Sequence, residues 1–189
     1  MLVLASKSPR RKELLSLITT DFIIKSAEVD EALPEGISPE NAVLYLSKIK
    51  AQAVFDGTDT VIGADTIVVL DGTILGKPSD DDEAFSMLRA LSGREHSVFT
   101  GVTVISPESE NSFYRETKVR FSELSDDEIR DYIATGECRD KAGAYGIQGF
   151  GSRFVEGISG DYFNVVGLPV SALYHALFKP DFFVDINKK

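Results

Sequence analysis

The chain has 189 residues, which is enough for one domain with a full core or for two small lobes that share a sheet. Its formal net charge of −10 excludes binding of long nucleic acid over the general surface, and no run of ~20 apolar residues could span a membrane. Cys138 is the only cysteine, so an internal disulfide is excluded. We therefore expect a cytoplasmic globular protein without a signal peptide. If it binds an anion, the anion must contact a local concentration of positive charge or metal ions.

The first expected element is a strand over residues 2–5, followed by a tight corner and a helix. Ser8 is a good N-cap, and Pro9 suits the first helical position because its missing N–H would have no partner there. Arg10 and Arg11 then place two cations in the first turn, where the helix dipole disfavours them. Two arginines, serine hydroxyls and the N–H groups of a helix start favour binding of an anion such as phosphate. The alternative is a solvated basic turn.

A short strand is expected at residues 22–25, followed by a loop that carries Glu31. A second Ser-Pro pair then opens a helix expected over residues 39–55. On a helical period Lys50 falls within the apolar stripe of this helix. Such a lysine either extends to the rim or reaches into a cleft, and the spacing leaves both alternatives open.

Residues 60–70 give the strongest strand signal, because the run is nearly continuous and rich in β-branched residues. Asp65 lies in the middle of it, and a carboxylate there needs a partner or a metal because a lone buried charge is costly. The small residues 63 and 64 would permit a bulge or the close approach of a ligand. The structural alternatives for Asp65 are a strand-end cap and a buried salt bridge. An Asp-Gly turn then leads into a strand at 73–75.

Two glycine-containing segments carry further candidate residues. Residues 76–78 are no Walker loop, because the glycine spacing is one residue short and the segment ends in proline, which lacks the magnesium-binding hydroxyl. Lys77 is either a point charge directed at the aspartate region or an ordinary surface lysine. Residues 140–151 lack a dinucleotide fingerprint but combine flexible backbone with polar side chains, Gln148 among them. This loop either wraps a planar ligand or is a plain connector.

The remaining elements follow from helical or alternating periodicity and from cap signals. They are helices at 80–91, 125–136 and 169–178, strands at 95–105, 113–121, 154–158 and 162–166, and a tail at 181–189. His96 and His175 show no metal-ligand spacing, so we expect both to be structural. Cys138 lacks a paired histidine motif and is not expected to be a nucleophile.

Six blocks of the sequence occur in an order that is typical of one protein family. They are residues 4–11 (LASKSPRR), 63–66 (GADT), 76–78 (GKP), 91–96 (LSGREH), 140–149 (DKAGAYGIQG) and 166–169 (VGLP). Together they resemble the Maf family of nucleotide pyrophosphatases over residues 2–178. The resemblance implies one α/β domain at residues 1–180, of the Maf/inosine-triphosphatase-like type, with a long mixed β-sheet flanked by helices and two lobes with a central cleft. It also implies hydrolysis of a nucleoside triphosphate to the monophosphate and pyrophosphate, with Mg²⁺ or Mn²⁺.

The resemblance also implies roles for individual side chains. The catalytic proton acceptor would be Asp65, and the residues that set base choice would be Arg10, Thr66 and Gln148. The phosphate-binding residues would be Ser6, Arg11, Lys50 and Lys77, and the metal ligands Glu31 and Asp65. An amide offers a donor and an acceptor, so Gln148 can pair with the O4 and N3–H edge of thymine or uracil.

Within the family, Ala64-Asp65-Thr66 and Gln148 are similar to the branch that hydrolyses dTTP and UTP. Modified pyrimidine triphosphates are further expected substrates, which would make this a house-cleaning enzyme. The alternatives are a 7-methyl-GTP pyrophosphatase and a non-catalytic nucleotide-binding regulator of septum formation. The resemblance also implies a homodimer.

Overall fold

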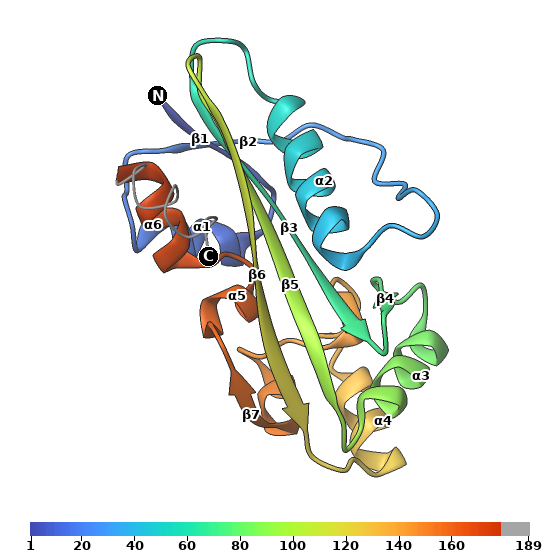
Figure 1. The fold of residues 1–189 in the computed structure, drawn as a ribbon. Helices are drawn as coiled ribbons and strands as arrows, with labels where there is room; N and C mark the ends of the chain where they lie inside the picture. Colours follow the sequence, from blue (N-terminus) through green and yellow to red (C-terminus); the bar gives the residue numbers. More distant parts are fainter. Residues whose placement is uncertain (179–189) are drawn as a thin grey trace. The chain divides into compact units, whose positions relative to one another are not determined.

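The computed structural model describes residues 1–178, and the predicted tail at 181–189 lies outside them (Figure 1). The strands are β1 (Leu2–Ala5), β2 (Ile23–Lys25), β3 (Thr60–Leu70), β4 (Thr73–Leu75), β5 (Glu95–Ile105), β6 (Glu110–Phe121) and β7 (Val155–Ser159). The helices are α1 (Pro9–Ser16), α2 (Pro39–Gln52), α3 (Asp81–Leu91), α4 (Asp126–Ala134), α5 (Tyr162–Val166) and α6 (Val170–Phe178), with 3₁₀ turns η1 (Ala142–Ala144) and η2 (Phe150–Phe154). Among these residues, no helix combines the length and the apolar character needed to cross a bilayer.

Within the described residues, seven strands form one sheet in the order β2-β1-β3-β5-β6-β7, with β4 paired to β3. The pairs β1–β2 and β1–β3 are parallel, whereas β3–β4 and β6–β7 are antiparallel, so the sheet is mixed. This confirms the predicted α/β class with a mixed sheet and flanking helices.

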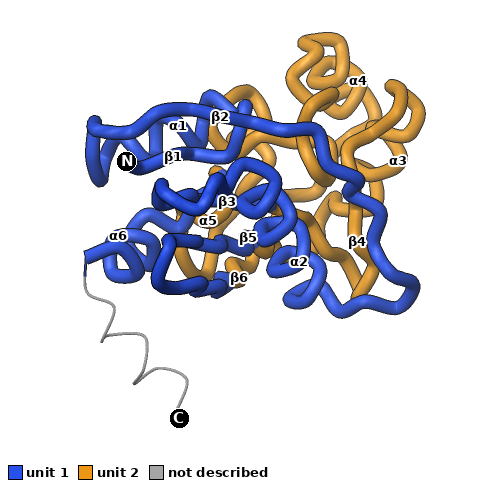
Figure 2. Tube along the Cα trace, turned by 90° about the horizontal axis from the view of Figure 1, so that it is seen from above, with its two compact units in different colours: residues 1–65, 100–115, 167–189 blue, residues 66–99, 116–166 orange. Residues whose placement is uncertain are grey.

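The described chain divides into two compact units, which are coloured separately in Figure 2. Unit 1 comprises residues 1–65, 100–115 and those from 167 on, and unit 2 comprises residues 66–99 and 116–166. The long strands β3, β5 and β6 each contribute residues to both units. Consequently Asp65 is the last β3 residue of unit 1, and its neighbour Thr66 is the first of unit 2.

In unit 1, helix α2 packs directly against the sheet (Figure 1). A Cβ on Gly63 of β3 would lie 2.2 Å from the carbonyl oxygen of Ser47, and one on Gly101 of β5 would lie 2.3 Å from that of Val43. Both strands therefore need glycine where the α2 backbone crosses them. Gly63 is one of the two small residues predicted to permit a bulge or the close approach of a ligand. In the structure it permits the close approach of helix α2. A small core that includes Val3 completes this packing.

Unit 2 is built around a larger apolar core, to which α3, α4 and the ends of β3, β5 and β6 contribute. Its largest buried side chains include Leu88, Leu91, Phe121, Tyr132 and Phe154. The predicted Asp-Gly turn joins β3 to β4, with both residues at positive φ, 50° and 78°. Such a turn matches the twist of a two-residue hairpin.

One predicted strand is wrong: residues 162–166 form helix α5. The β-branched pair at its end indicated a strand, but tertiary hydrogen bonds override that local preference. The fully buried Asn164 donates through Nδ2 to the carbonyl oxygen of Val98 at 2.9 Å and to Oγ1 of Thr117 at 3.0 Å. Asp161 accepts a bond from the N–H of Phe163 at 2.8 Å, which turns the chain before the helix.

Several predicted bounds also shift. Helix α3 begins at Asp81 with Asp80 as its N-cap, helix α2 ends at Gln52, and β6 begins at Glu110. These are differences of a few residues, as expected where caps and frayed ends define an element.

Candidate functional site

The corner after β1 forms as the sequence predicts. The Ser8 hydroxyl caps α1 by accepting the N–H of Arg11 at 3.4 Å, and Pro9 is the first helical residue. The buried Ser6 hydroxyl accepts both the Ser8 N–H at 3.2 Å and the Arg11 Nη1 at 3.4 Å. On its other side, Arg11 donates through Nε to the Gly167 carbonyl oxygen at 2.9 Å. The arginine fork is therefore held by unit 1 itself.

The charges around Arg11 identify its neighbours. Burial lowers the pKa of the Arg11 guanidinium. Among the nearby charges, the carboxylates of Asp65 and Glu31 raise this pKa, and the cation of Arg10 lowers it. An arginine stays protonated under all these influences. The predicted basic corner and the predicted carboxylates thus belong to one electrostatic neighbourhood in unit 1.

Lys50 joins the two carboxylates of that neighbourhood. Its Nζ donates to Oδ1 of Asp65 and lies 3.0 Å from Oε1 of Glu31. The side chains of Lys50 and Asp65 are 16% and 12% exposed, whereas that of Glu31 is 54% exposed. Lys50 therefore points toward these carboxylates, and that it reaches into a cleft stays a prediction. Asp65 does form a buried salt bridge, and it shares its cation with a second, accessible carboxylate.

The packing of α2 explains why these side chains meet. Gly63 and Asp65 are two residues apart on β3, so their side-chain positions lie on the same face of the strand. Gly63 would meet the N atom of Ala51 at 2.7 Å, which places the last turn of α2 over that face. Lys50 precedes Ala51 and therefore reaches Asp65 directly.

The two carboxylates suit a divalent cation. Glu31 and Asp65 already converge on one positively charged nitrogen, so their oxygens face a common point. Within residues 1–178 no three His, Cys, Asp or Glu side chains are grouped so that they could hold a metal. Mg²⁺ is commonly bound through one or two carboxylates, with the remaining positions taken by substrate phosphates and water. This donor set fits that pattern.

The other three predicted site residues belong to unit 2. Thr66 is half-buried on β3, and Lys77 and Gln148 are exposed in loops. The loop of Lys77 contacts the loop of Gln148, because the N–H of Gly143 donates to the carbonyl oxygen of Gly76 at 3.0 Å. That the two groups of residues meet on one substrate stays a prediction.

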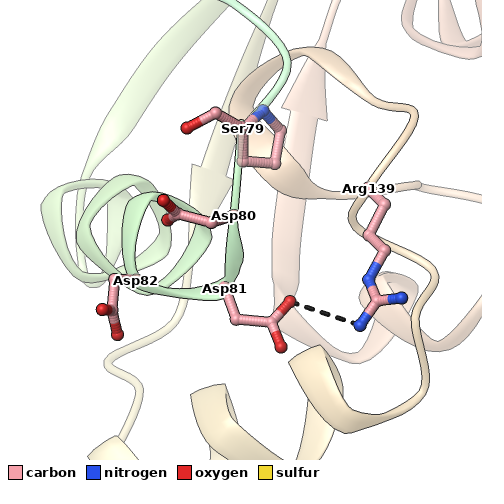
Figure 3. Close-up of a pocket in the computed structure, with 6 residues that line it drawn as sticks. Ser79, Asp80, Asp81, Asp82 and Arg139 are labelled. Atoms are coloured by element: carbon pink, nitrogen blue, oxygen red, sulfur yellow. Dashed lines mark hydrogen bonds and ion pairs between the residues drawn. The ribbon is translucent and has the colours of Figure 1, made fainter.

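A separate hollow in unit 2 contains none of the predicted site residues (Figure 3). It is lined by Pro78, Ser79, Asp80, Asp81, Asp82 and Arg139. Asp80 accepts the Glu83 N–H at 2.8 Å as the cap of α3, and Asp81 lies 3.5 Å from Nη2 of Arg139. Asp80 is therefore occupied as a helix cap and Asp81 as an ion-pair partner, and we assign the hollow no chemistry.

His96 and Cys138 are both buried in unit 2. The Nε2 of His96 lies 2.8 Å from the hydroxyl of Tyr145. Burial raises the pKa of the Cys138 thiol, which disfavours the reactive thiolate.

A family model described as "Maf-like protein" matches residues 1–179. The chain belongs to the Maf family. Its curated relatives are similar along nearly their whole length. It is 56% identical over 172 residues to a dTTP/UTP pyrophosphatase of Geobacillus sp. (strain WCH70), and the aligned residues cover 90% of this chain and 92% of the relative. It is 54% identical over 179 residues to one from Caldanaerobacter subterraneus subsp. tengcongensis, covering 92% and 86% of the two chains.

A third Maf relative is the dTTP/UTP pyrophosphatase of Bacillus cereus (strain B4264), 49% identical over 188 residues, which cover 98% of this chain and 97% of the relative. Among solved structures, the Staphylococcus aureus Ham1 protein aligns with a TM-score of 0.46 at 18% identity, over 64% of this chain and 71% of that one.

Sequence reasoning missed the residues that contact the candidate site residues of this Maf chain. The carbonyl of Gly167 holds Arg11, although the two are 156 positions apart. Glu137 and Tyr132 contact the loop that carries Gln148. The block around Gly167 was part of the family resemblance, but no local pattern indicates which atom a backbone carbonyl will meet.

Proposed function

We propose that this chain hydrolyses nucleoside triphosphates, dTTP and UTP above all, to the monophosphate and pyrophosphate. The structural observation that carries the proposal is the sharing of Lys50 by Asp65 and Glu31, in the same charged neighbourhood as Arg11. Cations and carboxylates so arranged suit a polyphosphate with its counter-ion. The names of relatives 49–56% identical to this chain supply the substrates.

In this mechanism Glu31 and Asp65 would hold Mg²⁺ or Mn²⁺, which would neutralise phosphate charge and make water easier to deprotonate. Asp65 accepts the proton of the water that attacks the α-phosphorus. Arg11 is held by Ser6 and Gly167, so its fork is preorganised for phosphate oxygens. Lys50 neutralises the two carboxylates, and with a metal ion bound to them its charge would be available to the phosphates.

The residues proposed to select the base have a different task. Gln148 pairs with the O4 and N3–H edge of thymine or uracil, because its amide has both an acceptor and a donor. Arg10 and Thr66 are proposed to complete the base site, and Lys77 to contact the phosphates. Modified pyrimidine triphosphates, a cytoplasmic location and a homodimer are further parts of the proposal.

The test is a pyrophosphate-release assay with purified protein, Mg²⁺ or Mn²⁺, and a panel of dTTP, UTP, CTP, GTP and 7-methyl-GTP. We expect release from dTTP and UTP, and loss of release when EDTA removes the metal. Preference for 7-methyl-GTP would assign the chain to the other substrate class. Nucleotide binding without release from any member of the panel would instead support the non-catalytic regulator.

A further inference from the structure

The backbone between Gly146 and Gly151 forms a closed loop with Gln148 near its tip. A Cβ on Gly151 would lie 2.7 Å from the carbonyl oxygen of Gly146, so the two ends of the loop touch. Gly146 and Gly151 are half-buried and buried, whereas Gln148 and its two following residues are exposed. The ends of this loop therefore determine where the glutamine is presented.

Glu137 binds the second end of the loop through both carboxylate oxygens. Its Oε2 accepts the N–H of Phe150 at 2.8 Å, and its Oε1 accepts the N–H of Gly151 at 3.2 Å. Gly149 must lack a side chain for this contact, because a Cβ there would lie 2.0 Å from Oε2. Because two consecutive backbone N–H groups bind one carboxylate, both the direction of the loop backbone and its distance from Glu137 are fixed.

Tyr132 binds the first end of the loop and ties it to the second. Its fully buried hydroxyl accepts the N–H of Gly146 at 3.2 Å and donates to Oε1 of Glu137 at 3.0 Å. Its pKa is raised by burial and further by the bond to Glu137, so the hydroxyl keeps its proton. The same two side chains therefore hold both ends of the loop.

Glu137 is itself held in place. Helix α4 ends at Ala134 and Gly136 follows with a φ of 74°, and the N–H of Glu137 donates to Oγ1 of Thr135 at 3.2 Å. Lys141 donates through Nζ to the backbone carbonyl oxygen of Glu137 at 2.6 Å. Burial tends to raise the pKa of this carboxyl, but the bonds from Phe150 and Gly151 outweigh it and leave the pKa lowered. The carboxylate is thus ionised and fixed.

We propose that Glu137 and Tyr132 are positioning residues for base selection: together they clamp residues 146–151 and thereby aim Gln148 at the pyrimidine edge. The proposal rests on the proposed function, because Gln148 is a base-selecting residue only if the chain acts on nucleotides. Neither clamp residue needs to touch substrate. The clamp acts through the loop backbone, so its loss should change how well bases are distinguished more than it changes the chemical step.

The test compares Glu137→Gln with the wild-type protein. The amide keeps one acceptor oxygen and presents a donor to the second backbone N–H, so one end of the loop is released. We expect the UTP-to-CTP ratio of kcat/KM to fall roughly fivefold to tenfold, as for the loss of one well-placed hydrogen bond. The change should arise in KM for UTP, with kcat altered less than twofold. Hydrogen exchange at Phe150 and Gly151 should become faster.

Glu128→Gln is the matched control, because it makes the same substitution in the same unit, on the helix that precedes Glu137. Glu128 closes the capping box at the first turn of α4, where it accepts the N–H and the hydroxyl of Ser125, both at 2.8 Å. The control should leave both the substrate ratio and exchange in the loop unchanged. Tyr132→Phe is the second variant: it keeps the ring and removes both bonds of the hydroxyl, and it should shift the ratio in the same direction.

Each outcome tests a different part of the proposal. If Glu137→Gln accelerates exchange in the loop but leaves the UTP-to-CTP ratio unchanged, the loop is clamped but does not select the base, and the inference is wrong. If exchange is unchanged, the clamp itself is wrong. A wild-type protein that hydrolyses no triphosphate contradicts the proposed function, and the positioning role is then overturned with it.

Discussion

The carboxylates at the candidate site in unit 1 and beside the Gln148 loop in unit 2 are held in opposite ways. In unit 1, Asp65 and Glu31 are held by the side-chain cation of Lys50. In unit 2, the Glu137 carboxylate is held by backbone N–H groups. The nearby Lys141 donates to the backbone carbonyl oxygen of Glu137 instead of to its carboxylate. A side-chain ion pair can be exchanged when a metal or a phosphate arrives, whereas a backbone hydrogen bond can be exchanged only by moving the chain.

This difference matches the tasks proposed for the two groups. A triphosphate with its metal carries large charges that exchangeable ions can meet without strict direction. A base edge differs from another base edge by the position of donors and acceptors, so its reader must be held in a fixed orientation. We infer that exchangeable contacts suit the phosphate chemistry and fixed contacts suit base selection. The following predictions test each side of that comparison.

The largest effect is expected in unit 1. Asp65→Asn keeps the size of the side chain but removes the proton acceptor, so turnover of dTTP should fall at least ~100-fold. Lys50 retains Glu31 as a partner at 3.0 Å, so the fold should persist. The measurement is pyrophosphate release under saturating substrate.

Asp59→Asn is the control for that prediction. Asp59 is also in unit 1 and is paired with the amino terminus at 3.0 Å and with Lys25 at 3.4 Å, away from the charged neighbourhood of Arg11. This variant should keep turnover within about twofold. If Asp65→Asn retained a tenth or more of wild-type turnover, Asp65 could not be the proton acceptor.

A smaller effect is expected in unit 2. Gln148→Glu replaces the donor of the amide with a second acceptor, which would face the O4 of thymine or uracil. The loss of one hydrogen bond and the repulsion between two facing acceptor oxygens should lower kcat/KM for dTTP by about tenfold or more. Steady-state kinetics on dTTP measure it. Full turnover of dTTP by this variant would remove Gln148 from base selection.

The smallest effect concerns the core that supports the unit 2 loop. Burial lowers the pKa of His96 from 6.5 to about 4, so the folded protein keeps this histidine neutral where the unfolded chain binds a proton. Its contribution to stability is therefore complete above pH 6.5 and is lost as the pH falls toward 4. Between pH 7.5 and 5.5 we expect the free energy of unfolding to drop by about 1 kcal/mol from this group alone.

Urea unfolding of the wild type and of His96→Gln at these two pH values measures that drop. The amide can still bond to the hydroxyl of Tyr145 but does not titrate, so its pH dependence should be weaker by the stated amount. Carboxylates with lowered pKa values, such as Asp56 at about 2, contribute equally to both proteins and cancel. Equal slopes in the two proteins would show that His96 is not buried in its neutral form.

Local signals were the reliable part of the sequence. The caps at Ser8, Ser38 and Ser125 and the Asp-Gly turn after β3 all formed where they were predicted. Each depends on residues within four positions of one another, so the pattern contains the whole interaction. Residues 162–166 failed for the opposite reason, because the partners of Asn164 lie 66 and 47 positions away.

By itself, the sequence determined the family, most of the elements and the identity of the candidate site residues, because motif order, periodicity and caps are written along the chain. Only the tertiary structure decided that Lys50 joins Asp65 to Glu31, since this depends on how closely α2 packs on Gly63 and Gly101. Only the structure, likewise, assigned Glu137 to the loop of Gln148. Backbone N–H groups are present at nearly every residue, so the sequence does not distinguish the two that meet a carboxylate until the chain has folded.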